Sequence, residues 1–248
     1  SPYFIKRRNV VDKTVPVRLR YYMTNTEILL NNGKSWKYCA ALGWRGQEGG
    51  PEIDDIKQRV VWMFPFGINI LEHQVYQPLT EVIQTLWLVP AWVSMDAVDL
   101  EITKLFDSKD DKDLVICTDF SKFDQHFNQS LQDSAKTILT SILNTDSDSH
   151  DWLEHVFPIK YDIPLSYDYG KIRFGKHGMG SGSGGTNADE TIAHRALQYE
   201  AALNNGARLN LNSQCLGDDG VLTYPGITVE DVVRSYSAHG QEMNEDKQ

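Results

Sequence analysis

Two adjacent carboxylates at the tip of an apolar hairpin constrain this chain more than any other feature; the segment reads Gly217-Asp218-Asp219-Gly220. Apolar pairs flank it, and glycine on both sides favours a tight turn between two strands. Two carboxylates about 4 Å apart repel each other by about 4 kcal/mol at an effective dielectric of about 20. A divalent cation at the tip would offset that repulsion. An ordinary turn is the alternative, because Asp and Gly are common turn residues.

A second pair of acids, Asp119 and Asp124, follows the short apolar segment 114–117. This segment is predicted to be a buried strand, and an acid at its C-terminal end lies at the rim of a sheet, where active sites gather. If the strand lies beside the hairpin, Asp119 and Asp218 face each other. Three carboxylates would then converge, which is enough to hold two Mg²⁺ ions. The alternative is that both upstream acids serve as turn or helix-capping residues.

A glycine-rich segment, 178–186, lies between these two acidic regions and has five glycines in nine residues. It opens a predicted helix, with Thr186 or Asn187 as the N-cap and Gly206 as the stop. Such a loop lets backbone come close to a ligand and offers free N–H groups, whereas a flexible linker is the alternative. The predicted apolar face of the helix consists of Ile192, Ala193, Ala196, Leu197 and Leu203.

The order of these elements resembles motifs A, B and C of viral RNA-dependent RNA polymerases: Asp119-x4-Asp124, Ser181-Gly182-x3-Thr186 and Gly217-Asp218-Asp219. The gaps of about 60 and about 35 residues also suit that family. Segments 181–191 and 59–65 are most similar to polymerases of double-stranded RNA viruses, picobirnaviruses first and partitiviruses second. The resemblance implies an RNA-directed RNA polymerase, a nucleotidyltransferase that copies RNA for viral genome replication and transcription.

The resemblance implies a role for each matching position. Asp119 and Asp218 would hold the metal ions, with Asp219 as the supporting acid. Asp124 would sense the 2′-hydroxyl of the incoming nucleotide. The motif B residues that would position the template and the nascent base pair are Ser181, Gly182 and Thr186.

Other positions match the family less closely. The family often has Asn where this chain has Glu190, an acidic variant similar to partitivirus-like enzymes, so the partner of Asp124 is left open. Arg59, with Lys57, resembles the motif F residue that contacts the triphosphate. Lys247 resembles the motif D lysine that protonates the leaving pyrophosphate, and an exposed tail lysine is its alternative.

The implied cofactor is a pair of Mg²⁺ ions, for which Mn²⁺ can substitute. The implied partners are an RNA template, a nascent strand, nucleoside triphosphates and the viral capsid protein. No membrane partner is expected, because the sequence has no signal peptide and no apolar run near 18 residues. The expected location is the host cytoplasm, within the virion.

Composition sets further bounds. The 248 residues, 41% of them hydrophobic, suffice for one large or two closely associated domains. A formal net charge of −10 argues against nucleic-acid binding, but segment 6–20 has six basic residues and one acid. That basic strip suits contact with RNA, and a solvated arm is the alternative. The cysteines form no disulfide framework and suit a reducing compartment; Cys117 and Cys215 are expected in the core.

The predicted fold class is α+β: a polymerase palm, with an antiparallel sheet backed by helices, partial fingers and no thumb. Residues 1–112 would form a fingers-like region with the basic arm and motif F. Residues 113–248 would form the palm with motifs A to D, and a fingers segment inserted between A and B. We expect the chain to be a fragment of a longer polymerase.

The pattern along the chain predicts individual elements. Helices are expected at 29–42 (interrupted by Gly33), 69–87 (with a kink or restart at Pro78), 96–106, 128–144 and 228–239. A loop is expected at 43–51, a strand at 60–64 and a hairpin at 161–174. Trp62, Phe64 and Phe66 are expected in the core, and His126 and His194 as ordinary surface or packing residues.

Three alternative functions remain open. A reverse transcriptase or another palm polymerase would share the acids of motifs A and C. An inactive palm-shaped module that binds RNA would share the fold. A calcium-binding acidic domain would share the acids, although the sequence has no Asp-x-Asp-x-Asp-Gly loop.

Overall fold

The computed structural model describes residues 8–11, 14, 38–47 and 57–244. They belong to two compact units. The first unit contains the described residues up to 74 together with 147–176 and 180–184. The second contains 75–146, 177–179 and the described residues from 185 onward.

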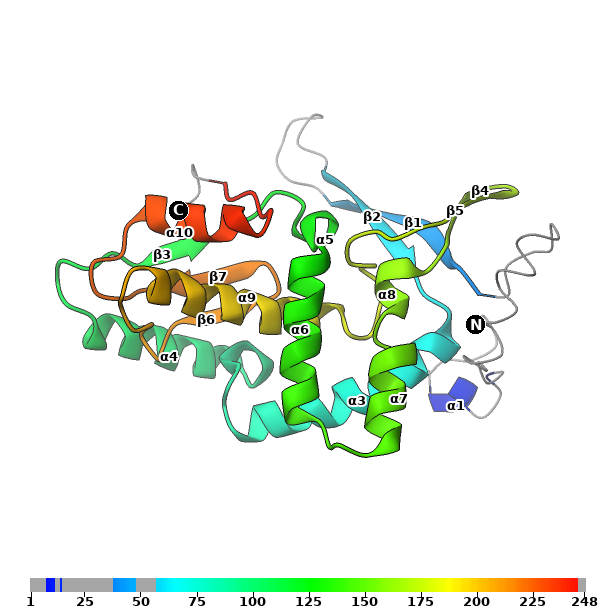
Figure 1. Cartoon of the computed structure of the whole chain (residues 1–248), viewed down its shortest axis with the longest axis horizontal. Coiled ribbons are helices and arrows are strands. Elements are labelled where there is room, and N and C mark those ends of the chain that lie inside the picture. The colour runs from blue at the N-terminus through cyan, green and yellow to red at the C-terminus, as the bar shows by residue number, and fades with distance from the viewer. Residues whose placement is uncertain (1–7, 12–13, 15–37, 48–56, 245–248) are drawn as a thin grey trace. The chain divides into compact units, whose positions relative to one another are not determined.

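The first unit is built on a four-stranded sheet with the strand order β2-β1-β4-β5. Its strands are β1 (Ala40–Gln47), β2 (Lys57–Met63), β4 (Leu165–Asp168) and β5 (Lys171–Arg173). β1 and β2 pair antiparallel, β1 and β4 pair parallel, and β4 and β5 form the hairpin predicted at 161–174 (Figure 1). The core of this unit consists of Ala40, Ile68, Ile159, Ile163 and Leu165, with Trp62 and Phe64 packed against it.

The helices of the first unit are short, apart from α3, which continues into the second unit. They are α1 (Arg8–Val11), α3 (Phe66–Thr85), α7 (Ser147–His155) and α8 (Ile159–Asp162). The helix predicted at 69–87 is confirmed, but Pro78 lies inside an uninterrupted α3. A restart of the helix at Pro78 is therefore wrong, because α3 continues through this residue.

The first strand of this sheet contradicts the sequence pattern. A helix was predicted to reach residue 42 and a loop to begin at 43, yet Ala40–Gln47 is β1. Each residue from Ala41 to Gln47 has a partner on β2, and a Cβ at Gly43 would lie 3.2 Å from Met63 Sδ. Glycine here permits close approach of a neighbouring side chain, so pairing with the next strand, β2, overrides local composition. Residues 29–37 lie outside the described residues.

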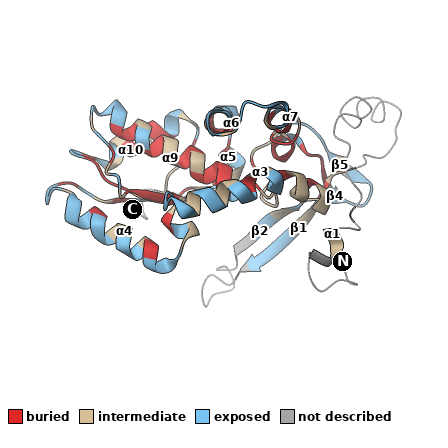
Figure 2. Cartoon of the chain, turned by 90° about the horizontal axis from the view of Figure 1, so that it is seen from below, coloured by how far each residue is buried: buried red, intermediate tan, exposed pale blue. Residues whose placement is uncertain are grey.

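The second unit is built on a three-stranded antiparallel sheet with the order β3-β7-β6. The strands are β3 (Ile116–Thr118), β6 (Gln214–Leu216) and β7 (Asp219–Leu222). The helices are the end of α3, η2 (Pro90–Trp92), α4 (Met95–Ser108), α5 (Phe123–His126), α6 (Gln129–Ile142), α9 (Thr186–Asn204) and α10 (Val229–Ala238). Figure 2 shows α9 and α10 on one side of this sheet and α4 on the other.

Local sequence explains where several of these helices begin. The Asn128 side chain accepts hydrogen bonds from the Ser130 and Leu131 amides at the start of α6. Thr228 does the same for the Asp231 amide at the start of α10. These caps satisfy backbone donors that have no partner within the helix. The helices predicted at 96–106, 128–144 and 228–239 are therefore confirmed.

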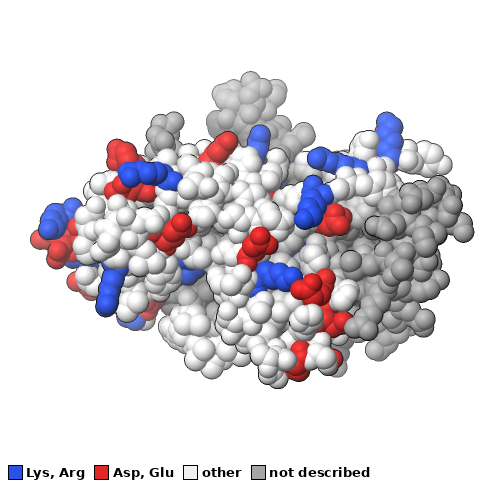
Figure 3. Space-filling view, in the orientation of Figure 1, with Lys and Arg blue, Asp and Glu red and all other residues white. Residues whose placement is uncertain are grey.

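The predicted fold class is confirmed by these elements, which combine an antiparallel sheet with helices that back it. Buried apolar side chains of the second unit include Ile116, Leu197, Leu222, Val232 and Tyr236. On the face shown in Figure 3, acidic and basic side chains lie interspersed among uncharged surface. Among the helices that the structure describes, none has the length and apolarity needed to cross a bilayer.

Candidate active site

The register of the second sheet brings the motif A and motif C acids to one edge. β3 and β7 pair antiparallel up to Thr118 opposite Gly220, so Asp119 follows at the end where Asp219 begins β7. Leu216 pairs with Asp219, which leaves Gly217 and Asp218 as a two-residue hairpin loop. Gly217 has a φ of 58°, a conformation that glycine adopts at little cost in such loops. The strand pairing predicted from the sequence is thus present.

Asp119 is held by a segment that the sequence analysis did not connect with it. The Asn244 side chain donates from Nδ2 to Asp119 Oδ2 at 3.1 Å, and its backbone N–H donates to the Asp119 carbonyl at 2.9 Å. A bridge between Phe120 and Met243 continues the pairing. Asp119 is half-buried, whereas Asp218 and Asp219 are exposed. No sequence pattern pointed to Asn244, because this pairing joins residues far apart in the chain.

Glu190 is the partner of Asp124 that the sequence left open. The Glu190 side chain is buried, and burial, together with the charges of Asp124 and Asp218, raises the pKa of its carboxyl to about 11. It therefore carries a proton at neutral pH and forms a hydrogen bond with Asp124. Its Oε1 atom has no hydrogen-bond partner among the described residues. A protonated carboxyl thus lies beside the Asp124 side chain near the hairpin.

A polar stripe on α9 holds the hairpin that carries Asp218. Thr191 Oγ1 accepts a hydrogen bond from the Gly217 N–H at 2.9 Å, and the ring nitrogen Nδ1 of His194 lies 2.8 Å from the Gly217 carbonyl oxygen. One turn further on, Gln198 Nε2 donates to the Gln214 carbonyl at 2.8 Å. Residues three and four apart share a helix face, so one side of α9 binds the backbone of β6 and its turn.

His194 is a packing residue, as expected, but it also makes directed contacts. It is fully buried, and its Nε2 atom lies 3.2 Å from Thr118 Oγ1. Burial lowers the pKa of its imidazole to about 4. The signal available in the sequence was the spacing of Thr191, His194 and Gln198, which places three polar side chains on one face of a predicted helix.

The predictions for the start and faces of α9 need correction. The N-cap is Gly185, not Thr186 or Asn187, because the Asp189 amide bonds the Gly185 carbonyl at 3.0 Å. Leu203, predicted on the apolar face, is 69% exposed. Polar side chains form much of the buried surface of α9, because the hairpin backbone and neighbouring side chains provide hydrogen-bond partners for them. Gly206, with a φ of 64°, lies just beyond the end of α9, as predicted.

The two cysteines on the paired strands differ in burial. Cys215 is buried, and its thiol lies 3.4 Å from the Thr191 carbonyl oxygen. Cys117 is exposed, which contradicts the expectation that it belongs to the core. Side chains alternate along a strand, and Ile116 and Thr118 occupy the buried positions of β3.

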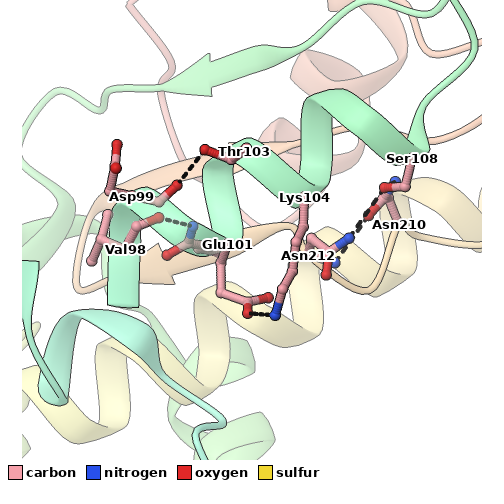
Figure 4. Close-up of polar contacts among 9 residues, drawn as sticks. Val98, Asp99, Glu101, Thr103, Lys104, Ser108, Asn210 and Asn212 are labelled. Carbon is pink, nitrogen blue, oxygen red and sulfur yellow. Dashed lines mark hydrogen bonds and ion pairs between the residues drawn. The ribbon is translucent and has the colours of Figure 1, made fainter. Parts of the chain in front are cut away.

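α4 fixes the loop that leads into β6. Figure 4 shows Ser108, at the end of α4, bonded by the side-chain amides of Asn210 at 2.9 Å and Asn212 at 3.1 Å. Gln214 Nε2 donates to the Val98 carbonyl at 3.2 Å. The hairpin is therefore held from α4 as well as from α9.

In the first unit, the motif B loop rests on α3 and β2. The buried carboxylate of Glu72 accepts hydrogen bonds from Ser183 Oγ at 2.5 Å and from the Gly184 N–H at 2.7 Å. Ser181 Oγ accepts from the Trp62 N–H at 3.4 Å, and a Cβ at Gly182 would overlap the Trp62 carbonyl oxygen. Gly182 therefore permits close backbone approach, as the sequence predicted for this loop. The anchoring role of Glu72 was not expected.

The β1–β2 ribbon carries the predicted motif F residue. Arg59 is exposed on β2 and lies directly opposite Arg45, which is also exposed. Like charges opposite each other on a sheet repel, and an anion between them would offset that cost. Sequence reasoning did not single out Arg45, because its pairing with Arg59 depends on a strand that was predicted as a loop.

Some predicted residues can be placed only in part. Thr186 is the first residue of α9 and is half-buried. Lys57 begins β2, and its side chain lies outside what the structure describes. Lys247 lies outside the described residues, as does most of the basic segment 6–20. Within the described residues, no three His, Cys, Asp or Glu side chains form a ready-made metal site.

Comparison with known proteins gives the class to which this fold and these acids belong. Residues 45–248 match the sequence family described as viral RNA-dependent RNA polymerase, and the chain belongs to that family. Among curated proteins, it is 63% identical over 249 residues to a potential RNA-dependent RNA polymerase of human picobirnavirus (strain Human/Thailand/Hy005102/-). That alignment covers 100% of this chain and 46% of the relative.

Two solved structures are also similar. The RNA-dependent RNA polymerase of a human picobirnavirus matches with a TM-score of 0.83 and 66% identity, over 87% of this chain and 41% of that chain. Its insertion loop deletion mutant matches with a TM-score of 0.87 and 59% identity, over 99% of this chain and 48% of that chain. The predicted resemblance to picobirnavirus polymerases and the palm architecture are thereby confirmed. The chain spans about half the length of these relatives.

Proposed function

We propose that this chain carries the catalytic centre of an enzyme that synthesises RNA on an RNA template by nucleotidyl transfer. The observation that supports this most directly is the register of β3 and β7, which brings Asp119 and Asp219 to one sheet edge beside the turn that holds Asp218. Membership of the viral RNA-dependent RNA polymerase family supports the same reaction.

The acids at this edge suit a pair of Mg²⁺ ions, with Mn²⁺ as a substitute. Carboxylate oxygens are the ligands that Mg²⁺ prefers, and Asp119, Asp218 and Asp219 supply them. The raised pKa of Glu190 is consistent with this view, because after burial the charges of Asp124 and Asp218 contribute to the shift. When bound, the two ions would activate the primer 3′-hydroxyl and offset charge on the leaving pyrophosphate.

The remaining residues would bind and orient the substrates. Asp124, with the proton held on Glu190, would contact the ribose 2′-hydroxyl of the incoming nucleotide. Arg59, with Lys57, would bind its triphosphate, and Lys247 would supply a proton to pyrophosphate. Ser181, Gly182 and Thr186 would seat the template and the nascent pair. Phosphoryl transfer requires mainly such positioning and electrostatic stabilisation from the protein.

The wider biological role follows from the same proposal. The substrates are an RNA template, a nascent strand and nucleoside triphosphates. The product serves replication and transcription of a double-stranded RNA genome in the host cytoplasm. The enzyme would act within the virion, next to the capsid protein.

Nucleotide incorporation by the complete polymerase with a primed RNA template tests this function. Asp119→Asn and Asp218→Asn should each lower kcat by at least about 100-fold, because each removes a carboxylate that holds metal. Asp111→Asn, at an exposed acid in the turn that precedes β3, is the matched control and should keep the parental rate.

The outcomes separate the alternatives. Parental rates in both site variants would contradict the assigned roles. RNA binding without any Mg²⁺-dependent incorporation would favour an inactive RNA-binding module. Preference for deoxynucleotides would favour a reverse transcriptase.

A further inference from the structure

We propose that His194 is a positioning residue for catalysis, which fixes the hairpin turn bearing Asp218 at a set distance from the strand bearing Asp119. The inference rests on the proposed function, because it concerns the geometry of the same acids. The inference is based on the buried imidazole of His194, which forms hydrogen bonds both with the turn that bears Asp218 and with the strand that precedes Asp119.

The hydrogen bonds of His194 determine which ring nitrogen carries the proton. A carbonyl oxygen can only accept, so Nδ1 must donate to the Gly217 oxygen 2.8 Å away. In the neutral ring, Nε2 is then an acceptor, and the Thr118 hydroxyl can donate to it across 3.2 Å. Burial keeps the pKa of the ring well below neutrality, so this neutral form holds under working conditions.

These two contacts reach the immediate neighbours of the catalytic acids. Gly217 precedes Asp218 in the turn, and Thr118 precedes Asp119 at the end of β3. One rigid ring therefore links the backbone before one acid to the side chain before the other. Thr191 adds a bond to the N–H of Gly217, so both backbone polar groups of this residue are held by α9.

The surrounding packing leaves the imidazole little room to move. Aromatic rings surround it, with centroid distances of 5.4 Å to Phe120, 5.9 Å to Phe123 and 5.6 Å to Tyr236. On the sheet side, a Cβ at Gly220 would lie 2.6 Å from His194 Cε1 and 2.5 Å from Thr118 Oγ1. Gly220 thus provides the space through which His194 reaches β3. A ring held on every side can set distances within a fraction of an ångström, which catalysis requires.

Replacement by phenylalanine separates positioning from packing. His194→Phe keeps a planar ring among the aromatic neighbours and removes both hydrogen bonds. In the complete polymerase, we expect kcat to fall at least about 10-fold, while KM for nucleotides and Kd for RNA change less than about threefold. His194→Asn, whose amide nitrogen lies near the place of Nδ1, should recover part of the lost kcat. Parental kcat in a folded His194→Phe enzyme would overturn the proposal.

A second pair of variants applies if His194→Phe does not fold. Thr118→Val removes the donor to Nε2 at nearly constant shape, whereas Thr118→Ser retains a hydroxyl. The valine variant should have a lower kcat than the serine variant, with similar melting temperatures. Equal kcat values would count against the proposal.

A spectroscopic measurement keeps this inference separable from the proposed function. ¹⁵N chemical shifts of the His194 ring in the parental protein should show Nδ1 protonated and Nε2 unprotonated. The opposite tautomer would overturn the inference even if the enzyme is active. If the parent incorporates no nucleotide but shows the expected tautomer, the proposed function fails while the assigned contacts stand.

Discussion

At the scale of single residues, the site depends on one position that carries no side chain. Gly220 lies between Thr118 and His194, and any Cβ there would come within 2.6 Å of both side chains. Real Cβ atoms do not approach that closely, so a substitution must displace the ring, the hydroxyl or the strand. The identity of this residue is therefore set by its neighbours and not by the conformation of its own backbone.

Gly220→Ala should lower the free energy of unfolding by about 1–3 kcal/mol, because the new methyl group overpacks the space beside His194. Gly46→Ala is the matched control: it adds the same methyl group on β1, where no atom lies within 4 Å of the new position. The control should stay within about 0.5 kcal/mol of the parent. Urea denaturation of both variants measures the difference, and equal stabilities would contradict the close packing.

Glu190 shows how burial, together with neighbouring acids, raises the pKa of a carboxyl group. In the folded chain its pKa lies near 11, so it stays protonated at pH 8, whereas in the unfolded chain it is ionised. At pH 8 this protonated state costs folding stability, because the Glu190 carboxyl can release its proton and be hydrated as a carboxylate only in the unfolded chain.

Glu190→Gln should therefore melt at a higher temperature than the parent at pH 8, since glutamine is neutral in both states and can still donate to Asp124. The expected gain exceeds about 1 kcal/mol in free energy of unfolding. Glu81→Gln, at an exposed position on α3, is the control and should change stability by less than about 0.5 kcal/mol. Thermal unfolding in metal-free buffer measures both, and a lower Tm for Glu190→Gln would contradict the protonated state.

At the scale of elements, α9 does more than cover the sheet. Its buried residues include Thr191, His194 and Gln198, which bond the backbone around the hairpin. A helix usually buries an apolar stripe, and the sequence was interpreted in that way. The polar stripe is buried here because it bonds backbone groups of the turn residue Gly217 and of the edge strand β6.

The pH dependence of stability should reflect His194. Its pKa is lowered to about 4, first by burial and then by the charge of Arg195, from about 6.5 in the unfolded chain. Between these values the unfolded state binds a proton that the folded state does not. This group therefore contributes stability above pH 6.5 that is lost as the pH falls towards 4.

When the pH is lowered from 6.5 to 4.5, the free energy of unfolding should therefore fall less for His194→Phe than for the parent. The difference between the two proteins should be up to about 1.4 kcal/mol per pH unit. Chemical denaturation at a series of pH values, with the parent as reference, gives the difference. Parallel pH profiles for the two proteins would contradict a buried neutral imidazole.

At the scale of the whole molecule, periodicity and capping residues predicted the long helices, and motif order predicted the strand pairing. Asn128 and Thr228 mark helix starts that local sequence alone determines. β1 could not be predicted in this way, since Gly43 and Gly46 are typical of loops and the strand exists through its pairing with β2. The prediction that Cys117 is buried was wrong for a related reason. The sequence shows that strand residues alternate between two faces, but the packing of the sheet decides which face is buried.

The candidate site also combines residues that local sequence predicts with residues that only the three-dimensional structure reveals. The acids Asp119, Asp218 and Asp219 were predictable because strand ends and turns have local signals. Their supports, Asn244 and Thr191, were not, because each bonds a residue far away in the chain: Asn244 bonds the Asp119 carboxylate and Thr191 bonds the Gly217 N–H. Satisfaction of buried polar groups is decided by three-dimensional neighbours, which a single sequence does not reveal.

The pairing of β3 with β7 also has a consequence for biosynthesis. The paired residues Thr118 and Gly220 are about 100 positions apart, so the acids meet only after a long stretch of chain has been made. Pairing across such a separation is slow to form, because a large loop must close first. Residue 222, the last residue of β7, must therefore leave the ribosome before β7 can pair fully with β3 and bring the three carboxylates together. A shorter nascent polypeptide lacks part of this pairing.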